Sequence, residues 1–249
     1  MTALLIFIFG LAIGSFLNVV IYRFSKNQSI VFPPSRCPKC QTKIKFRDNI
    51  PLISFIILRG RCRSCREKIS WQYPLVELAT GLIFVLLHWH SGLTLDFLRF
   101  AIFAVFLLVI FVYDLKYYLI LDRVAVPAMI IAFILNWLAG FGPVNLILAG
   151  LAGSGFFALQ YFVSSGRWVG GGDIRLGAVM GLMLGWPMLL VALFLAYLSG
   201  ALIGVSLIVL GKKKMSSELP FGAFLAPATL VTLLFGLPLL SWYLNLINL

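Results

Sequence analysis

The sequence predicts an all-α polytopic membrane protein with about eight transmembrane helices and one small cytoplasmic insert. Three observations predict this fold class. Hydrophobic residues make up 61% of the 249 residues and charged residues only 11%, which excludes a soluble domain of ordinary composition. Apolar runs recur along the whole chain, and each spanning helix needs about 20 mostly apolar residues. One polar stretch, from Arg23 to Tyr73, interrupts these runs.

The apolar runs give the expected helices in order. We expect them at residues 3–22, 74–90, 97–113, 124–140, 144–163, 174–186, 187–210 and 222–247. The first run has no basic stretch before it and no small-residue cleavage site after it, so we expect it to stay as an anchor. The run at 174–186 covers only about 20 Å. It could instead continue into the next helix through a kink at Pro187.

These boundaries divide the chain into three parts. The parts are an N-terminal transmembrane anchor at 1–22, a cytoplasmic insert at 23–73 and a seven-helix membrane block at 74–249. The insert holds 12 of the 20 Lys and Arg residues. Short loops rich in Lys and Arg stay in the cytoplasm, so the N-terminus is expected outside.

Later basic residues test this orientation. With eight alternating spans they fall in cytoplasmic connections, except Arg99. Merging 174–210 into one span would place Lys212, Lys213 and Lys214 outside, so the charge pattern favours a separate short helix. The net charge of +12 is then mainly a topology signal, helped by attraction to anionic membrane lipids. Nucleic acid explains it less well and is not an expected partner.

The insert carries two C-x-x-C pairs, CPKC and CRSC, with twenty-one residues between them. Two such pairs at this spacing are typical of a tetrahedral thiolate zinc site of the ribbon kind. The expected ligands are Cys37, Cys40, Cys62 and Cys65. A redox pair is the alternative. Four thiolates would fill the coordination sphere and leave no open position, so the zinc is expected to be structural.

Two of the eight acidic residues stand out at the ends of apolar segments. Asp114 closes a long apolar run, and Asp173 follows Gly170, Gly171 and Gly172. Carboxylates beside spanning segments are costly and are therefore candidates for function. The predicted topology puts both at cytoplasmic helix ends, where they can meet. Two neighbouring carboxylates can hydrolyse a peptide, one activating water and the other protonating the departing amine.

Each carboxylate also has an ordinary interpretation. Asp173 could be a helix cap, and Asp114 could be an interfacial charge. The three glycines are expected to form an active-site loop with unusual backbone conformations that lets a substrate strand come close. Because a helix N-terminus favours a carboxylate and a C-terminus disfavours it, Asp173 is expected to act as the base and Asp114 as the acid.

Several motifs in order resemble the type IV prepilin peptidases. They are GSFLNVVIYR at 14–23, the two cysteine pairs, NIPLISFIILRGRC at 49–62, YPLVEL at 73–78, the segment ending at Asp114, and GGGD at 170–173. The chain differs from the family at two places where prolines are usual. It has Ile120-Leu121-Asp122 where I-P-D is expected, and Phe221-Gly222-Ala223-Phe224 where F-G-P-F is common.

The resemblance implies an enzyme of the bacterial inner membrane with its active site facing the cytoplasm. Its substrates would be prepilins and the pseudopilins of type II secretion, cut after a glycine at the end of a short basic leader. The resemblance implies catalytic roles for Asp114 and Asp173. It also implies methylation of the new N-terminus from S-adenosylmethionine. A peptidase without methyl transfer, or a non-enzymatic transporter or assembly factor, are the alternatives.

Overall fold

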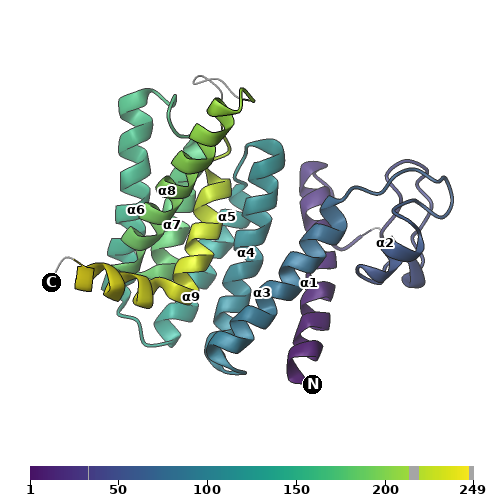
Figure 1. The fold of residues 1–249 in the computed structure, drawn as a ribbon, viewed down its shortest axis with the longest axis horizontal. Coiled ribbons are helices and arrows are strands. Elements are labelled where there is room, and N and C mark those ends of the chain that lie inside the picture. The colour runs from purple at the N-terminus through teal and green to yellow at the C-terminus, as the bar shows by residue number, and fades with distance from the viewer. Residues whose placement is uncertain (33, 213–218, 247–249) are drawn as a thin grey trace. The chain divides into compact units, whose positions relative to one another are not determined.

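The computed structural model describes residues 1–32, 34–212 and 219–246. Lys213, Lys214 and the last residue of the predicted span at 222–247 lie outside these ranges. The regular structure of the described residues is helical (Figure 1). Its longer helices are α1 (Thr2–Ser25), α3 (Gln72–Ser91), α4 (Leu95–Tyr117), α5 (Asp122–Leu138), α6 (Pro143–Ser164), α7 (Gly171–Leu184), α8 (Met188–Val209) and α9 (Gly222–Leu246).

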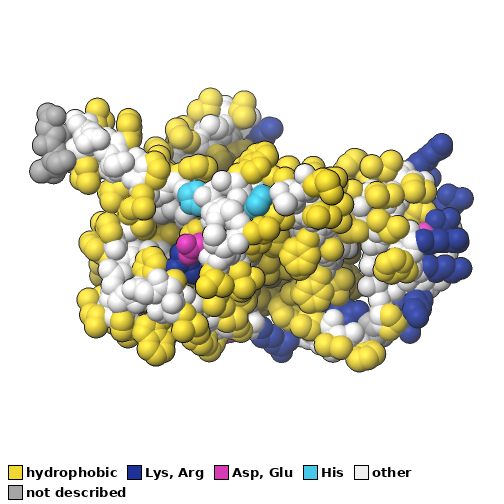
Figure 2. All heavy atoms as spheres, turned by 90° about the horizontal axis from the view of Figure 1, so that it is seen from below, with side chains coloured by type: hydrophobic (Ala, Val, Ile, Leu, Met, Phe, Trp, Pro, Cys, Tyr) yellow, Lys and Arg dark blue, Asp and Glu magenta, His cyan; other side chains and the backbone are white. Residues whose placement is uncertain are grey.

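Each predicted span corresponds to one of these helices. Six helices are long and apolar enough to cross a membrane: α1, α3, α4, α6, α8 and α9. The remaining two are shorter, since α5 has 17 residues and α7 has 14. Figure 2 shows that much of the molecular surface seen from below is hydrophobic, as lipid-facing helices require. The chain is therefore a multi-pass membrane protein.

The described residues form two compact units, and the boundary falls in the first turn of α4. The first unit is Met1–Phe97 and the second is Leu98–Leu249. In the first unit α1 packs closely on α3. A Cβ added at Gly10 would lie 2.8 Å from the Cα of Gly81, and one at Gly14 would lie 2.7 Å from the Cα of Glu77. Glycine is therefore required where these two helices touch.

The polar insert of the first unit contains two short helices, η1 (Phe46–Asp48) and α2 (Ile53–Ile57). Its backbone forms hydrogen-bonded turns and two isolated antiparallel β-bridges, one between Arg36 and Lys43 and one between Arg61 and Lys68.

In the second unit α7 is the central element, because it contacts α5, α6, α8 and α9. A Cβ added at Gly177 or Gly181 would overlap backbone atoms of α6, so these glycines allow α6 and α7 to touch. The helix ends at Gly185, which has φ +68°, and α8 begins after Pro187. The structure therefore separates the short helix from α8, as the charge pattern predicts, and the continuous kinked helix is not formed.

Candidate functional site

Asp114 lies one turn before the end of α4 and is buried, with 5% of its surface exposed. Its Oδ2 accepts a hydrogen bond from the backbone N–H of Ala223 at 2.9 Å. Ala223 belongs to the first turn of α9, where backbone N–H groups have no partner within the helix. A Cβ added at Gly222 would lie 2.9 Å from the same oxygen. The start of α9 therefore packs directly on this carboxylate and holds it in place.

Asp173 is the third residue of α7 and is also buried, at 6% exposure. Its Oδ2 accepts the backbone N–H of Gly170 at 2.9 Å, and its own N–H donates to the Gly170 carbonyl at 3.0 Å. This reciprocal pair closes the first turn of α7 in the manner of a capping box. Asp173 thus does stabilise its own helix, and the contact also fixes the direction of the carboxylate.

The segments that carry the two carboxylates meet at one buried side chain. Ile120, which is 5% exposed, packs between the segments that hold them. A Cβ at Gly172 would lie 3.0 Å from the Cβ of Ile120, and one at Gly222 would lie 3.2 Å from its Cδ1. The Ile120 side chain therefore touches the starts of both α7 and α9. The structure brings the two predicted aspartates together through this contact.

The glycine run differs from the expected loop. Gly170 is the cap before α7, and Gly171 and Gly172 form the first turn of the helix. None of the three has a positive φ, so unusual backbone conformation is not the reason for glycine here. Gly172 is needed because Ile120 is too close for a side chain. A Cβ at Gly171 would meet nothing within 4 Å, so this residue leaves open space near Asp173.

The helix-terminus argument for acid and base roles leaves out one helix and stays a prediction. It assumed that Asp114 senses only the C-terminal end of its own helix. The structure adds the N-terminus of α9, whose N–H group at Ala223 donates to Asp114. Each carboxylate is therefore held by a helix N-terminus, but Asp114 lies in addition near the C-terminus of α4, so the expected difference between the two becomes smaller.

An ion pair lies on the exposed side of α7. Arg175 Nε is 2.8 Å from the Oδ1 of Asp122, the first residue of α5, and both side chains are largely exposed. Arg175 follows Asp173 by two residues, so the pair joins the start of α5 to the helix that carries the carboxylate. An exposed pair of this kind contributes little to stability.

The first unit contains the four predicted cysteines. Their Sγ atoms all lie within 4.8 Å of one another, and those of Cys37 and Cys65 are 3.8 Å apart. Two sulfurs of a tetrahedral zinc site with Zn–S bonds of about 2.3 Å are about 3.8 Å apart, whereas a disulfide requires about 2.05 Å. The four thiols thus form a cluster that could hold a metal ion, and its spacing does not fit disulfides.

The two halves of the cluster are built alike. Cys37 N–H donates to the Thr42 carbonyl at 3.0 Å, and Cys62 N–H donates to the Glu67 carbonyl at 2.8 Å. In each half the residue after the second cysteine has a positive φ. The sequences agree as well, because RCPKCQTKI at 36–44 and RCRSCREKI at 61–69 are identical at five positions in register. The insert therefore contains a short internal repeat that sequence reasoning missed.

Two further contacts hold the insert. Arg63 Nη2 is 2.6 Å from Asp48 Oδ1, and the hydrogen bond from this guanidinium lowers the pKa of the Asp48 carboxyl. Glu77, 7% exposed in α3, accepts the backbone N–H of Leu52 at 2.9 Å, just before α2. Glu77 is thus an anchor for the insert. It lies in the second turn of α3.

Sequence reasoning also missed the roles of Ile120 and Ala223. Ala223 was noted only as a place where a proline is usual, and Ile120 only as the residue before another such place, Leu121. Ala223 directly follows Gly222, a residue that packs on Asp114, whereas Ile120 has no glycine beside it in the sequence and meets Gly172 only in the folded chain.

Comparison with known proteins gives two matching family models. One is described as the bacterial peptidase A24 N-terminal domain and matches residues 8–91. The other is described as the type IV leader peptidase family and matches residues 101–205. No solved structure matches the chain.

Among curated proteins, several named prepilin leader peptidase/N-methyltransferase are similar over nearly the whole chain. The one from Bacillus subtilis is 33% identical, covering 97% of this chain and 98% of that protein. The one from Legionella pneumophila is 31% identical, covering 97% and 94%. The one from Pseudomonas aeruginosa is 32% identical, covering 95% and 91%.

Proposed function

The chain belongs to the type IV leader peptidase family, and we propose that Asp114 and Asp173 are the carboxylates with which it cleaves its substrates. It is a prepilin peptidase with N-methyltransferase activity. The observation that supports the assignment is the burial of the two aspartates beside each other, each fixed by a backbone N–H at 2.9 Å. Rigid placement of reacting groups is what catalysis by proximity needs.

The pair can perform the hydrolysis with one water molecule. One carboxylate takes a proton from the water molecule while the water oxygen bonds to the peptide carbonyl carbon. The tetrahedral intermediate then loses the amine when the carbon–nitrogen bond breaks, and the other carboxyl group supplies the proton that the amine takes up. The open space beside Gly171 is where an extended substrate backbone could approach Asp173.

We assign the substrates and the location from the family and the charge pattern. The substrates are prepilins, and the pseudopilins of type II secretion are included. The protein lies in the bacterial inner membrane with its N-terminus outside. The insert and the carboxylate pair then face the cytoplasm, because the insert holds most of the Lys and Arg residues.

The four cysteines fit a structural zinc ion. Bound zinc would cross-link the two repeated halves of an insert that has few buried apolar residues. The methyl donor is S-adenosylmethionine, which supplies an electrophilic methyl group when it is bound. The described residues that line the cavities of the first unit are basic, apolar or uncharged polar, and none is a carboxylate, so they do not suit a donor with net positive charge.

The test is mass spectrometry of a prepilin incubated with the purified protein and S-adenosylmethionine. We expect a shortened product that carries one added methyl group. Asp114→Asn and Asp173→Asn should each lower cleavage by roughly a thousandfold. Asp96→Asn, at the opposite end of α4, is the matched control and should cleave normally. Cleavage retained by either active-site variant would exclude the aspartyl assignment. An unmethylated product would select a peptidase alone, and an uncut prepilin would favour a transporter or assembly factor.

A further inference from the structure

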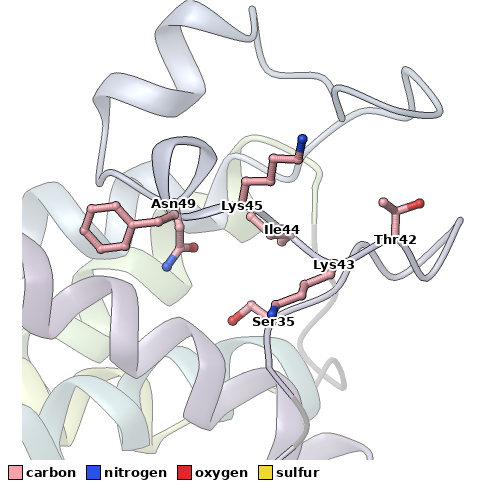
Figure 3. Close-up of a pocket in the computed structure, with 7 residues that line it drawn as sticks. Ser35, Thr42, Lys43, Ile44, Lys45 and Asn49 are labelled. Carbon is pink, nitrogen blue, oxygen red and sulfur yellow. The ribbon is translucent and has the colours of Figure 1, made fainter.

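The first unit contains two adjoining cavities, one within the insert and one between the insert and α1. One has a volume of about 740 Å³ and is lined only by insert residues, including Lys43, Lys45 and Asn49 (Figure 3). The other has a volume of about 470 Å³ and runs along α1. Ser35, Phe46 and Asn49 line both cavities, so together they form one groove. These volumes are in the range of small-molecule sites.

The α1 end of the groove is apolar and lies at membrane depth. Its lining residues on α1 include Ala12, Phe16 and Val19, which are spaced three and four apart and therefore share one helix face. Because α1 is long and apolar enough to span a membrane, this face meets lipid hydrocarbon. An occupant of this end must therefore be apolar and must be able to enter from the bilayer.

The opposite end of the groove is positively charged. Arg23, in the last turn of α1, lines the cavity and is 6% exposed. Its Nη1 donates to the Ser29 carbonyl at 2.8 Å, which fixes the guanidinium beside the segment that forms the groove wall. Lys43 lines the other cavity, and Figure 3 shows its side chain directed toward Ser35. Because α1 ends here, this part of the groove lies at the level of lipid head groups.

Charge decides between the possible occupants. The methyl donor has a net positive charge, and a prepilin leader is basic, so Arg23 and Lys43 would repel both. A small free anion would leave the apolar wall along α1 without a contact partner. A molecule with an anionic head and a hydrocarbon tail matches both ends of the groove.

We propose that this groove binds one anionic phospholipid, with an acyl chain along Ala12–Val19 of α1 and its phosphate against Arg23 and Lys43. The lipid would join the transmembrane helix α1 to the cysteine-bearing insert. The proposal does not depend on the peptidase assignment, because it concerns a separate group of residues.

The internal repeat provides a matched control for the charge. Lys43 and Lys68 occupy equivalent positions, each paired through the backbone with an arginine, but only Lys43 lines the groove. The measurement is native mass spectrometry of the full chain titrated with phosphatidylglycerol or with phosphatidylcholine of the same acyl chains. Lys43→Ser should weaken phosphatidylglycerol binding about fivefold, because each basic residue near a lipid head group contributes about that factor. Lys68→Ser should leave it unchanged.

A second pair of variants tests the apolar end. Ala12→Trp should fill the groove and weaken binding of both lipids, whereas Leu4→Trp, exposed on the same helix, should not. Zinc content and melting temperature equal to those of the wild type would show that each variant is folded. Equal losses in Lys43→Ser and Lys68→Ser would overturn the proposal in favour of unspecific surface attraction. Displacement of the lipid by inorganic phosphate or by S-adenosylmethionine would instead assign the groove to a free anion or to the methyl donor.

Discussion

Adding one carbon atom at Gly222 should slow the cleavage reaction. A Cβ there would lie 2.9 Å from Asp114 Oδ2 and 3.1 Å from its Cγ, so the carboxyl group would have to move. We expect Gly222→Ala to lower the rate of prepilin cleavage by about a hundredfold, because a shift of about 1 Å in a reacting group has that effect. Gly155→Ala is the control, since a Cβ at Gly155 meets nothing within 4 Å. Equal rates for the two variants would show that the start of α9 does not position Asp114.

Ala223 is where the chain departs from the proline that is common in its family, and the departure has a chemical consequence. Proline has no backbone N–H, so only a residue such as alanine can donate to Asp114 here. Ala223→Pro should therefore reduce cleavage about tenfold, in line with the loss of one hydrogen bond to a charged group. Ala223→Ser keeps the N–H and should cleave at the wild-type rate. A normal rate for Ala223→Pro, measured in the same prepilin assay, would mean that this donor is dispensable.

The identity of the candidate site residues could be predicted from the sequence, but their partners could not. Asp114, Asp173 and the four cysteines are recognisable because few residue types can perform their chemistry. Ile120 and Ala223 act through packing and through a backbone N–H, and neither property depends strongly on residue type. Such contacts join segments more than a hundred residues apart, and only the folded chain shows them.

At the scale of elements, the insert should depend on its metal and on pH. The Cys40 thiol lies 3.3 Å from the Thr42 hydroxyl, and hydrogen bonding to Thr42 is the largest of the causes that lower the pKa of Cys40 to about 6. A lowered thiol pKa favours the thiolate above that pH, so metal binding should persist at neutral pH and weaken as the pH falls toward 6. Removal of the metal with a chelator should speed hydrogen exchange throughout the two cysteine loops.

The Thr42→Val variant tests the sign of this effect. Without the hydroxyl the pKa of Cys40 should rise, and zinc should leave at a higher pH than from the wild type. A colorimetric zinc indicator read during acid titration measures the release. Ser64→Ala, in the second loop, is the control and should release zinc at the wild-type pH. A lower release pH for Thr42→Val would contradict the assigned role of the Thr42 hydroxyl.

Helix positions follow from the sequence because hydrophobicity and length are local properties. The predicted and observed boundaries of α4, for example, differ by two residues at the start and four at the end. The helical first turn of α7 was not predicted, since a run of glycines has low helix propensity. Packing of Gly172 on Ile120 and the hydrogen bonds of Asp173 stabilise that turn.

At the scale of the whole molecule, the helices that pack together in the structure are not the ones that the composition of the sequence groups together. The sequence predicts an anchor, an insert and a seven-helix block, and that division stays a prediction. In the structure α3 packs on α1 and belongs to the same compact unit as the insert. Composition could not indicate this, because α3 is an apolar helix like those of the second unit. Its packing partner is determined by the glycine contacts at Gly10 and Gly14.

The orientation of the chain depends on whether α7 crosses the membrane. With 14 residues α7 is about 21 Å long, which is less than the usual hydrocarbon thickness of about 30 Å. Its central position among α5, α6, α8 and α9 shields it from lipid, so a short helix can still cross. We therefore expect residues 165 and 212, on the two sides of the α7–α8 pair, to face the cytoplasm together.

Cysteine labelling measures this directly. A membrane-impermeant maleimide applied to intact spheroplasts should label Leu93→Cys, which lies in the predicted outer connection between α3 and α4. Ser165→Cys and Lys212→Cys should react only after the membrane is permeabilised. Labelling of the parent chain, which has only the four native cysteines, is measured alongside and subtracted. Labelling of Lys212→Cys from outside, with Ser165→Cys still protected, would mean that α7 and α8 together cross once. Labelling of Ser165→Cys from outside, with Leu93→Cys protected, would invert the chain and place the carboxylate pair on the outer side.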